Sequence, residues 1–291
     1  MEWLRQRIEA QVLSLTGLAL PGVDYLNPPG DPGLFGPDAV CWRVHGDFTS
    51  MLAGGIAALL LQALHPLALA GVWDHSSFRD DLLGRLRRTG QFIASTIFGS
   101  RDDAERLIER VRHIHLAVHG QAEDGRRYAA SDPELLTWVH VAEVSCFLQA
   151  HLRYLNPGLP GEAQDRYYAE VADIARRLGA SAVPADRQAV ARYLEASRGE
   201  LRCDQRAGEI LRILRSAPAP SLLARPFAAL MLQAGIDLLP HWAQQMFGLS
   251  MSPARRWLVR TAVRLTAKLL RWAVRNGSVH RARRRMGLPP R

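Results

Sequence analysis

The chain has 291 residues, of which 48% are hydrophobic and 22% charged, so it is long enough to bury a full core and too apolar to be disordered. Its cysteines, Cys41, Cys146 and Cys203, form no C-x-x-C or C-x-x-C-H motif, which excludes a cysteine zinc site and covalently attached haem and predicts reduced thiols in the cytoplasm. Residues 251–291 hold twelve of the 37 basic residues and none of the 28 acidic ones, so the net charge of +9 is concentrated in this tail.

The first 38 residues are predicted to form a helix followed by an irregular segment that wraps the surface. Acidic residues at positions 2 and 9 argue against a secretion signal. The segment 21–37 is rich in Pro and Gly and cannot be regular structure. The expected helix has one apolar face, formed by Leu4, Ile8, Val12 and Leu15.

Residues 51–73 form the most apolar stretch of the chain, long enough by itself for a membrane span. Pro66 interrupts it, and charged sequence follows at once, so we predict the most buried helix of an all-α domain instead. Gly54 and Gly55 should allow a neighbouring helix to approach closely. We expect His65 to satisfy the carbonyl groups that the proline frees, or alternatively to line a pocket.

Two helices should follow, over residues 80–98 and from Ser100 or Asp102 to Gly120, the first of them capped by residues 74–77. On the first, Arg85 and Thr89 lie one turn apart beside an apolar stripe, with Arg88 and Phe92 nearby. An arginine in this position usually extends its charged end to solvent. On the second, His115 falls on the apolar face that is formed by Ala104, Leu107, Ile108, Val111, Ile114 and Val118.

A long central helix is predicted from Pro133 to about Tyr154, because Ser131, Pro133 and Glu134 form a strong helix start. It is apolar nearly all round and includes His140. No segment alternates like a strand, which makes the fold all-α. Further helices are predicted over residues 162–178, 184–196, 204–214, 221–239 and 254–276.

The last predicted helix, residues 254–276, has a purely basic side and an apolar side. Packed on the domain, it would present a solvated basic face. Otherwise that face would contact anionic lipid head groups, with Trp257 and Trp272 at the interface. Nucleic acid would suit such a stripe too, but no helix-turn-helix or stacking pattern accompanies it. The basic side comprises Arg256, Arg260, Arg264, Lys268, Arg271 and Arg275, and the apolar side Leu258, Ala262, Leu265, Leu269 and Trp272.

Known metal and nucleophile motifs are absent from the sequence. There is no H-E-x-x-H, no pair of Glu-x-x-His helices, no G-x-S-x-G and no phosphate loop. His115 and His119 are four residues apart and would share one turn of a helix, so they could hold a non-haem metal ion jointly. A histidine among aliphatic residues is more often a hydrogen-bonded core residue, but haem would need such a neutral imidazole, an apolar wall and cations such as Arg85 and Arg88.

A set of short motifs, in order along residues 40–240, resembles the catalytic domain of the MpaB and latex-clearing rubber oxygenase family. They are Gln62-x-x-His65-Pro66, His75-Ser76-x-Phe78, Arg85-x-x-Arg88-Thr89-x-x-Phe92, Phe98-Gly99 and Ile114-His115-x-x-Val118-x-Gly120. The run from Tyr128 to His140 and Asp165-Arg166-Tyr167-Tyr168 extend the likeness.

The resemblance implies a single all-helical domain with a globin-like core that holds non-covalent haem b (iron protoporphyrin IX). It implies that His115 is the proximal iron ligand and that Arg85, Arg88 and Thr89 line the haem pocket. Arg88 stands where rubber oxygenases have lysine, and Asp74 is the acid nearest to the expected position of their distal glutamate. Phe92, His65 and His140 complete the expected pocket, the two histidines as reserve ligands.

The sequence therefore predicts three parts: residues 1–38, a haem-binding oxygenase-like domain over 39–250, and the basic tail 251–291. We expect an oxidoreductase that oxidises an apolar substrate, an isoprenoid or another lipophilic small molecule, with O₂ and an unidentified electron donor. It would be cytoplasmic or peripheral to an anionic membrane contacted through residues 254–276. Two alternatives stand: a non-haem metal enzyme using His115 and His119, and a non-enzymatic helical protein that docks on membrane through its basic tail.

Overall fold

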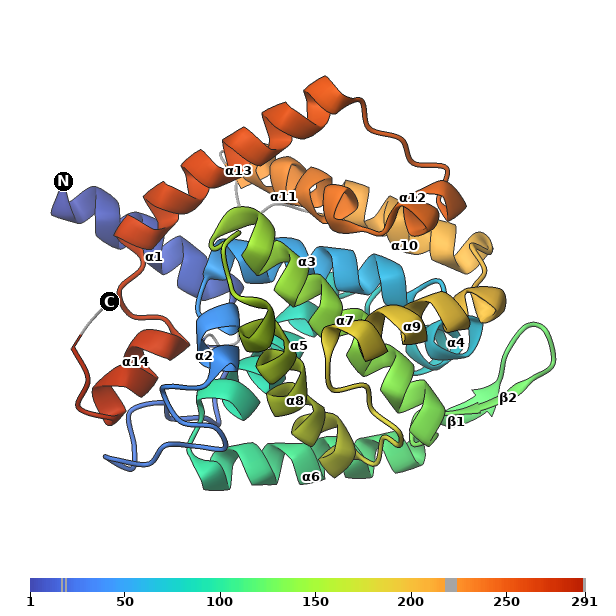
Figure 1. Cartoon of the computed structure of the whole chain (residues 1–291), viewed down its shortest axis with the longest axis horizontal. Helices are drawn as coiled ribbons and strands as arrows, with labels where there is room; N and C mark the ends of the chain where they lie inside the picture. Colours follow the sequence, from blue (N-terminus) through green and yellow to red (C-terminus); the bar gives the residue numbers. More distant parts are fainter. Residues whose placement is uncertain (17, 19, 218–223, 290–291) are drawn as a thin grey trace.

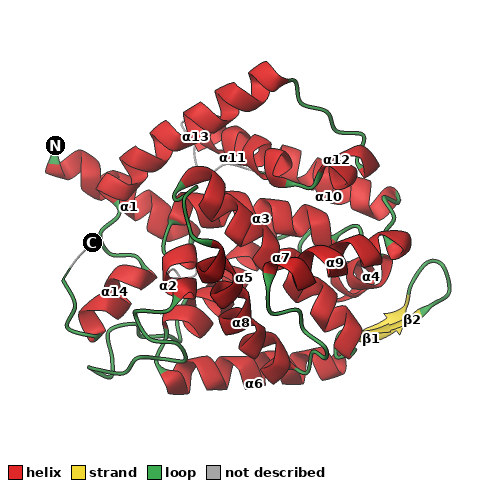
Figure 2. Ribbon diagram, in the orientation of Figure 1, coloured by secondary structure: helices red, strands yellow, loops and turns green. Residues whose placement is uncertain are grey.

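A computed structural model describes residues 1–16, 18, 20–217 and 224–289, and nearly all of its regular structure is helical (Figures 1 and 2). The all-α fold is confirmed, whereas the globin-like core stays a prediction. The N-terminal half contains α1 (Glu2–Leu15), α2 (Val40–His45), α3 (Phe48–Gln62), α4 (Pro66–His75), α5 (Leu82–Phe98), α6 (Arg101–Ala117), β1 (His119–Gln121), β2 (Arg127–Ala129) and α7 (Pro133–Tyr154). The chain continues with α8 (Gly161–Leu178), α9 (Arg187–Ser197), α10 (Gln205–Ser216), α11 (Arg225–Leu238), α12 (His241–Met246), α13 (Pro253–Ala273) and α14 (Ser278–Arg285).

The centre of the molecule is the crossing of α3 with α7, with α11 packed on another side of α3 (Figure 1). Gly54 permits this crossing, because a Cβ there would lie 2.9 Å from Cδ1 of Phe147. Gly235 on α11 has the same role, since its Cβ would lie 2.5 Å from Cγ2 of Ile56. A Cβ at Gly55 would make only an ordinary van der Waals contact, at 3.8 Å from Cε1 of Phe147. The prediction of close packing is therefore confirmed for Gly54.

The apolar stretch 51–73 is divided between α3 and α4, which meet at an angle of 106°. Within the described residues no single helix is long and apolar enough to cross a membrane. The bent pair of α3 and α4, taken together, has the length and composition of a membrane span. Leu60, Leu61 and Leu64 are fully buried in the main hydrophobic cluster, as expected of a core helix.

His65 caps α4, but not in the way that the sequence suggested. Its Nδ1 accepts a hydrogen bond from the backbone N–H of Ala68 at 3.4 Å. The proline break starts a new helix, and a new helix leaves free N–H groups at its first turn. The expectation that His65 satisfies carbonyl groups was therefore wrong.

The two helices after α4 begin and end differently from the prediction. Asp81, and not residues 74–77, caps α5 by accepting a hydrogen bond from the N–H of Gly84 at 2.8 Å. Of the two predicted caps of α6, Ser100 is the one that the structure has, but α6 ends at Ala117. The chain then enters the β1–β2 hairpin, in which Gly120 pairs with Tyr128. A Cβ at Gly120 would lie 2.6 Å from the Tyr128 hydroxyl oxygen, so this glycine permits a close contact and does not end the helix.

The last long helix, α13, packs on the domain neither through the predicted apolar side nor through the basic side alone. Its buried residues are Val259, Val263, Ala267, Leu270 and Ala273, and basic residues lie beside them. Arg260 donates to both carboxylate oxygens of Asp237, at 2.8 and 3.0 Å, and Arg271 donates to those of Asp47, at 2.7 and 3.2 Å. The basic side thus contributes ion pairs to the body of the protein, and the prediction of a wholly solvated basic face was wrong. The exposed side carries Trp257, Leu258, Leu265, Leu269 and Trp272, which are 38–65% exposed.

Helix α1 lies beside the C-terminal part of α13 (Figure 1). Val12 packs with Leu270 and Val274 in a small buried cluster, as its place on the predicted apolar face requires. Arg5 donates to the carbonyl oxygen of Ala273 at 2.7 Å and fixes the two helices together.

Candidate functional site

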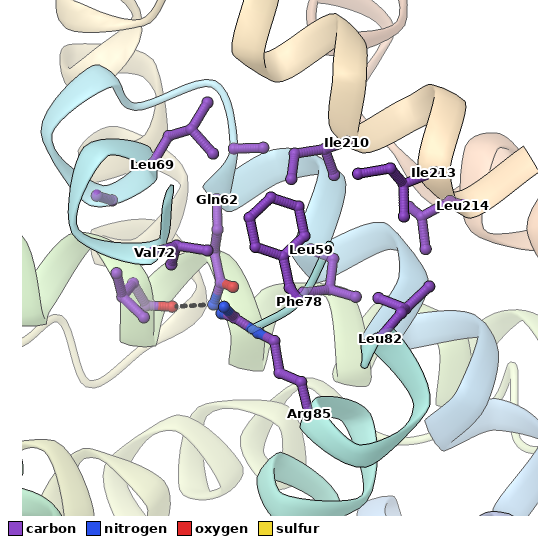
Figure 3. A pocket seen from close by; sticks show the side chains of 13 residues that line it. Leu59, Gln62, Leu69, Val72, Phe78, Leu82, Arg85, Ile210, Ile213 and Leu214 are labelled. Atoms are coloured by element: carbon purple, nitrogen blue, oxygen red, sulfur yellow. Dashed lines mark hydrogen bonds between the residues drawn. The ribbon is translucent and has the colours of Figure 1, made fainter. Parts of the chain in front are cut away.

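A cavity of about 100 Å³ lies between α3, α4, α5, α7 and α10 (Figure 3). Its walls are apolar except for Gln62 and Arg85, which come from two different helices. The remaining lining residues are Leu59, Ala63, Ala68, Leu69, Val72, Phe78, Leu82, Val139, Ile210, Ile213 and Leu214. Because a few polar groups in an apolar cavity are typical of small-molecule sites, this cavity is the candidate site.

Arg85 places a cation in this apolar setting. Its Nη1 donates a hydrogen bond to Oγ of Ser76 at 2.8 Å, and the guanidinium lies next to the Gln62 side chain (Figure 3). Burial, and then the charge of Arg88, lower the pKa of Arg85 to about 10. Among the described residues Arg85 forms no ion pair, so its charge is available to a ligand.

The other predicted residues of α5 do not line the cavity. Arg88 is exposed, with Nη1 3.4 Å from Oδ2 of Asp81, and Thr89 is exposed as well. Phe92 is half-buried and packs against a second hydrophobic cluster. Of the four α5 residues predicted, only Arg85 therefore reaches the cavity, because the later turns extend beyond it.

His115 is half-buried on α6 and is not among the residues that line the cavity. Its Nδ1 is buried without a hydrogen-bond partner in the described structure. Burial lowers the pKa of His115, so the ring is neutral at pH 7. A buried polar atom without a partner costs about 1–3 kcal/mol, which a bound group would offset.

Helix α7 carries two titratable groups that are not among the residues lining the cavity. His140 has a buried Nε2 without a described partner, and burial lowers its pKa to about 4. Burial raises the pKa of Glu143 to about 7. Glu143 lies one helical turn after Val139, whose side chain lines the cavity. No sequence motif marks Glu143, which is the only acidic residue of α7 beyond the first turn.

The paired histidines of the non-haem alternative are not arranged as that hypothesis needs. Because α6 ends at Ala117, His119 lies in β1 and is exposed, and the two rings do not share a helical turn. No group of three or more His, Cys, Asp or Glu side chains suited to a metal ion occurs among the described residues. Asp74 accepts a hydrogen bond from the Tyr128 hydroxyl at 2.7 Å and does not line the cavity.

The donor groups suit haem in their chemistry. His115 and His140 are neutral imidazoles that each have a buried nitrogen without a described partner, and Arg85 is a cation beside apolar walls. The cavity itself is smaller than the roughly 300–1,000 Å³ of ordinary ligand pockets. Of α5, whose residues 82–94 are all half-buried or exposed, only Leu82 and Arg85 line the cavity.

Comparison with known proteins gives one match. The family model described as ER-bound oxygenase mpaB/B'/Rubber oxygenase, catalytic domain, matches residues 42–272. Neither a curated protein nor a solved structure matches the chain. The matched region includes every helix that borders the cavity, and it includes Arg85, His115 and Glu143.

Proposed function

Because the chain belongs to the mpaB/rubber oxygenase catalytic-domain family, we propose that it is a haem b-dependent oxygenase that oxidises a lipophilic small molecule with O₂. The observation that carries this proposal is the apolar cavity with Arg85 as its cation. An apolar wall selects a hydrocarbon-like substrate, and a cation without an ion pair can stabilise negative charge that develops on oxygen.

In this proposal each of four side chains has its own role. Bound haem would supply the iron centre at which O₂ is activated. His115 would hold it through a ring nitrogen, and His140 is the alternative ligand. Arg85, held by Ser76, would donate N–H groups to oxygen in the cavity. Glu143, with a pKa of about 7, would take up or release a proton near neutral pH.

The apolar lining favours an isoprenoid or a similar alkene as the substrate. Two reactions fit this class and differ in their electron balance. Cleavage of the double bond places both oxygen atoms of O₂ in carbonyl products and needs no reductant. Insertion of a single atom reduces the other to water and needs two electrons from a donor. The reductant requirement therefore distinguishes the two reactions.

Oxygen uptake by the haem-supplemented full chain tests this function. A polyprenyl alkene should stimulate uptake, and the saturated hydrocarbon of equal length should not. Incorporation of label from ¹⁸O₂ into two carbonyl groups without reductant would establish cleavage, and one labelled atom with reductant would establish insertion. The proposal is overturned if haem-loaded protein shows no alkene-dependent uptake with or without a reductant.

We further propose that the exposed side of α13 contacts an anionic membrane surface. This side carries two tryptophans and three leucines. The neighbouring helix α1 adds Trp3 and Leu4, which are 66% and 50% exposed. An apolar patch of this kind on a helix face is typical of interfacial helices.

Charge supports a lipid surface as the occupant of this patch. Arg255, Arg264, Lys268 and Arg275 are exposed along α13 and just after it, and residues 251–291 contain no acidic residue. Cations beside an apolar face suit anionic head groups. The membrane proposal thus rests on the exposed apolar residues and on these four cations, and Arg260 and Arg271 contribute to the packing of the helix instead.

A further inference from the structure

A second site, which is charged and shares no lining residue with the Arg85 cavity, lies around Asp237 of α11. The Asp237 side chain is 0% exposed, and three arginines surround it. Arg260 donates to both of its oxygens, Arg153 donates to Oδ2 at 3.1 Å, and Nε of Arg256 lies 3.9 Å from Oδ1. One negative charge is thus shared among three positive charges.

These arginines line a cavity of about 440 Å³ between α7, α8, α9, α11, α12 and α13. It has no lining residue in common with the Arg85 cavity. Part of its wall is apolar and is formed by Leu148, Val190, Leu194 and Leu238. The volume is within the range of ordinary ligand pockets, roughly 300–1,000 Å³.

Among the described residues that line this cavity, Asp237 is the only acid, so the positive charge is not balanced there. A fourth lining arginine, Arg187, is neutralised by Asp165, to which it donates at 2.8 and 3.1 Å. Arg256 donates from Nη2 to Gln244, but its Nε is buried without a hydrogen-bond partner in the described structure. A partly buried charge cluster of unequal sign favours a bound counter-ion.

We propose that this cavity binds a small organic anion, with its charged end at Arg256 and its apolar part against Leu148 and Leu194. A carboxylate or a phosphate monoester would suit it, because both accept two parallel hydrogen bonds from a guanidinium group. The apolar wall distinguishes such a molecule from a free inorganic ion. This site is separate from the proposed oxygenase site, and its test does not depend on haem.

Titration calorimetry of the full chain at pH 7 and low salt tests the proposal, with octanoate, octanol and inorganic phosphate as probes. We expect one octanoate per chain, weaker binding of phosphate and no saturable binding of octanol. Octanol that binds as tightly as octanoate would overturn the role of charge. Phosphate that binds while octanoate does not would overturn the role of the apolar wall.

Variants of Arg256 locate the site. Arg256→Gln should weaken octanoate binding about tenfold or more, since a charge-assisted hydrogen bond contributes about 1.5–3 kcal/mol. Arg256→Lys keeps the charge and should retain more binding than Arg256→Gln. The control, Arg192→Gln, removes an exposed charge from α9, which borders the cavity, at a residue outside the cavity lining, and should leave binding unchanged. Equal octanoate affinity in the wild type and in folded Arg256→Gln protein would overturn the proposal.

Discussion

Arg85 donates a hydrogen bond to the Ser76 hydroxyl oxygen at 2.8 Å, and this contact joins α5 to the C-terminal cap of α4 at the edge of the apolar cavity. The guanidinium is held by a neutral partner and not by a carboxylate. Its charge is therefore costly to bury and available to a ligand, and two effects of its removal can be predicted together.

Replacement of Arg85 by glutamine should stabilise the protein and impair the reaction. Burial lowers the pKa of Arg85, so folding disfavours its charged form at every pH below about 10. After allowance for its partial exposure, we expect Arg85→Gln to raise the free energy of unfolding by about 1 kcal/mol, equally at pH 6 and pH 9. Alkene-dependent oxygen uptake should fall about 100-fold.

Arg88→Gln is the matched control for this prediction, because Arg88 is exposed one turn away on the same helix. The free energy of unfolding of Arg88→Gln should differ from that of the wild type by no more than about 0.5 kcal/mol. Urea denaturation measures both variants. An Arg85→Gln protein that is less stable than the wild type would show that the charge is compensated in the fold.

Glu143 should make stability depend on pH in a way that Glu143→Gln removes. Burial raises its pKa to about 7 from an ordinary value of 4.5, so the folded protein holds a proton that the unfolded chain releases. This contribution is favourable to about pH 4.5 and is lost as the pH rises to 7. The free energy of unfolding of Glu143→Gln, measured relative to that of the wild type, should therefore rise by about 2 kcal/mol between pH 5 and pH 8. A difference between the two proteins that is constant over this range would contradict the assignment.

Close packing of α3 on α7 should make Gly54 intolerant of any side chain. A Cβ at Gly54 would lie 2.9 Å from Phe147, so Gly54→Ala should destabilise the fold by about 1–3 kcal/mol. Gly208 in α10 is the control, since a Cβ there would meet nothing within 4 Å. Gly208→Ala should stabilise by about 1 kcal/mol through helix propensity alone. If the denaturation midpoints of Gly54→Ala and Gly208→Ala shift in the same direction relative to the wild type, this packing is contradicted.

The exposed side of α13 should control membrane binding. We expect the wild type to float with vesicles that contain phosphatidylglycerol, and to float less with phosphatidylcholine alone. The double variant Leu265→Ser, Leu269→Ser should lose most of this binding. Leu155→Ser, which alters an exposed leucine outside α13, should keep it. A double variant that floats like the wild type, or a wild type that forms dimers through this face, would overturn the membrane contact.

Local signals predicted several elements correctly. The proline at 133 followed by Glu134 placed the start of α7 at the residue where it begins, although Asp132 and not Ser131 is its cap, and Ser100 is one of the two caps predicted for α6. These features depend on neighbouring residues only. The break at Pro66 was located for the same reason, since a proline lacks the N–H that would continue the helix.

Features that depend on distant residues were not predictable in this way. The periodicity of α13 separates a basic from an apolar side, but the buried face of the helix is formed by Val259, Val263, Ala267 and Leu270, which belong to neither side. Asp47 and Asp237, which pair with its arginines, lie elsewhere in the chain. The end of α6 was likewise missed, because Gly120 resembles a helix terminus and instead makes room for Tyr128.

The candidate site was predicted in part. Arg85 lines the cavity, whereas Arg88 and Thr89 are exposed, because helical spacing cannot tell how far along α5 the cavity extends. Gln62 was noted as part of a motif only. Glu143 was overlooked, since burial shifts its pKa and burial follows from the tertiary fold.

The most direct test of the account is a spectroscopic titration of the full chain with haem. The wild type should bind one haem and develop a sharp Soret band. His113→Ala should behave in the same way, because His113 is exposed on the same helix and bonded to the Glu109 carbonyl. His115→Ala should lose the band or shift it. A chain that binds no haem, or a His115→Ala protein with an unchanged spectrum, would contradict His115 as the iron ligand.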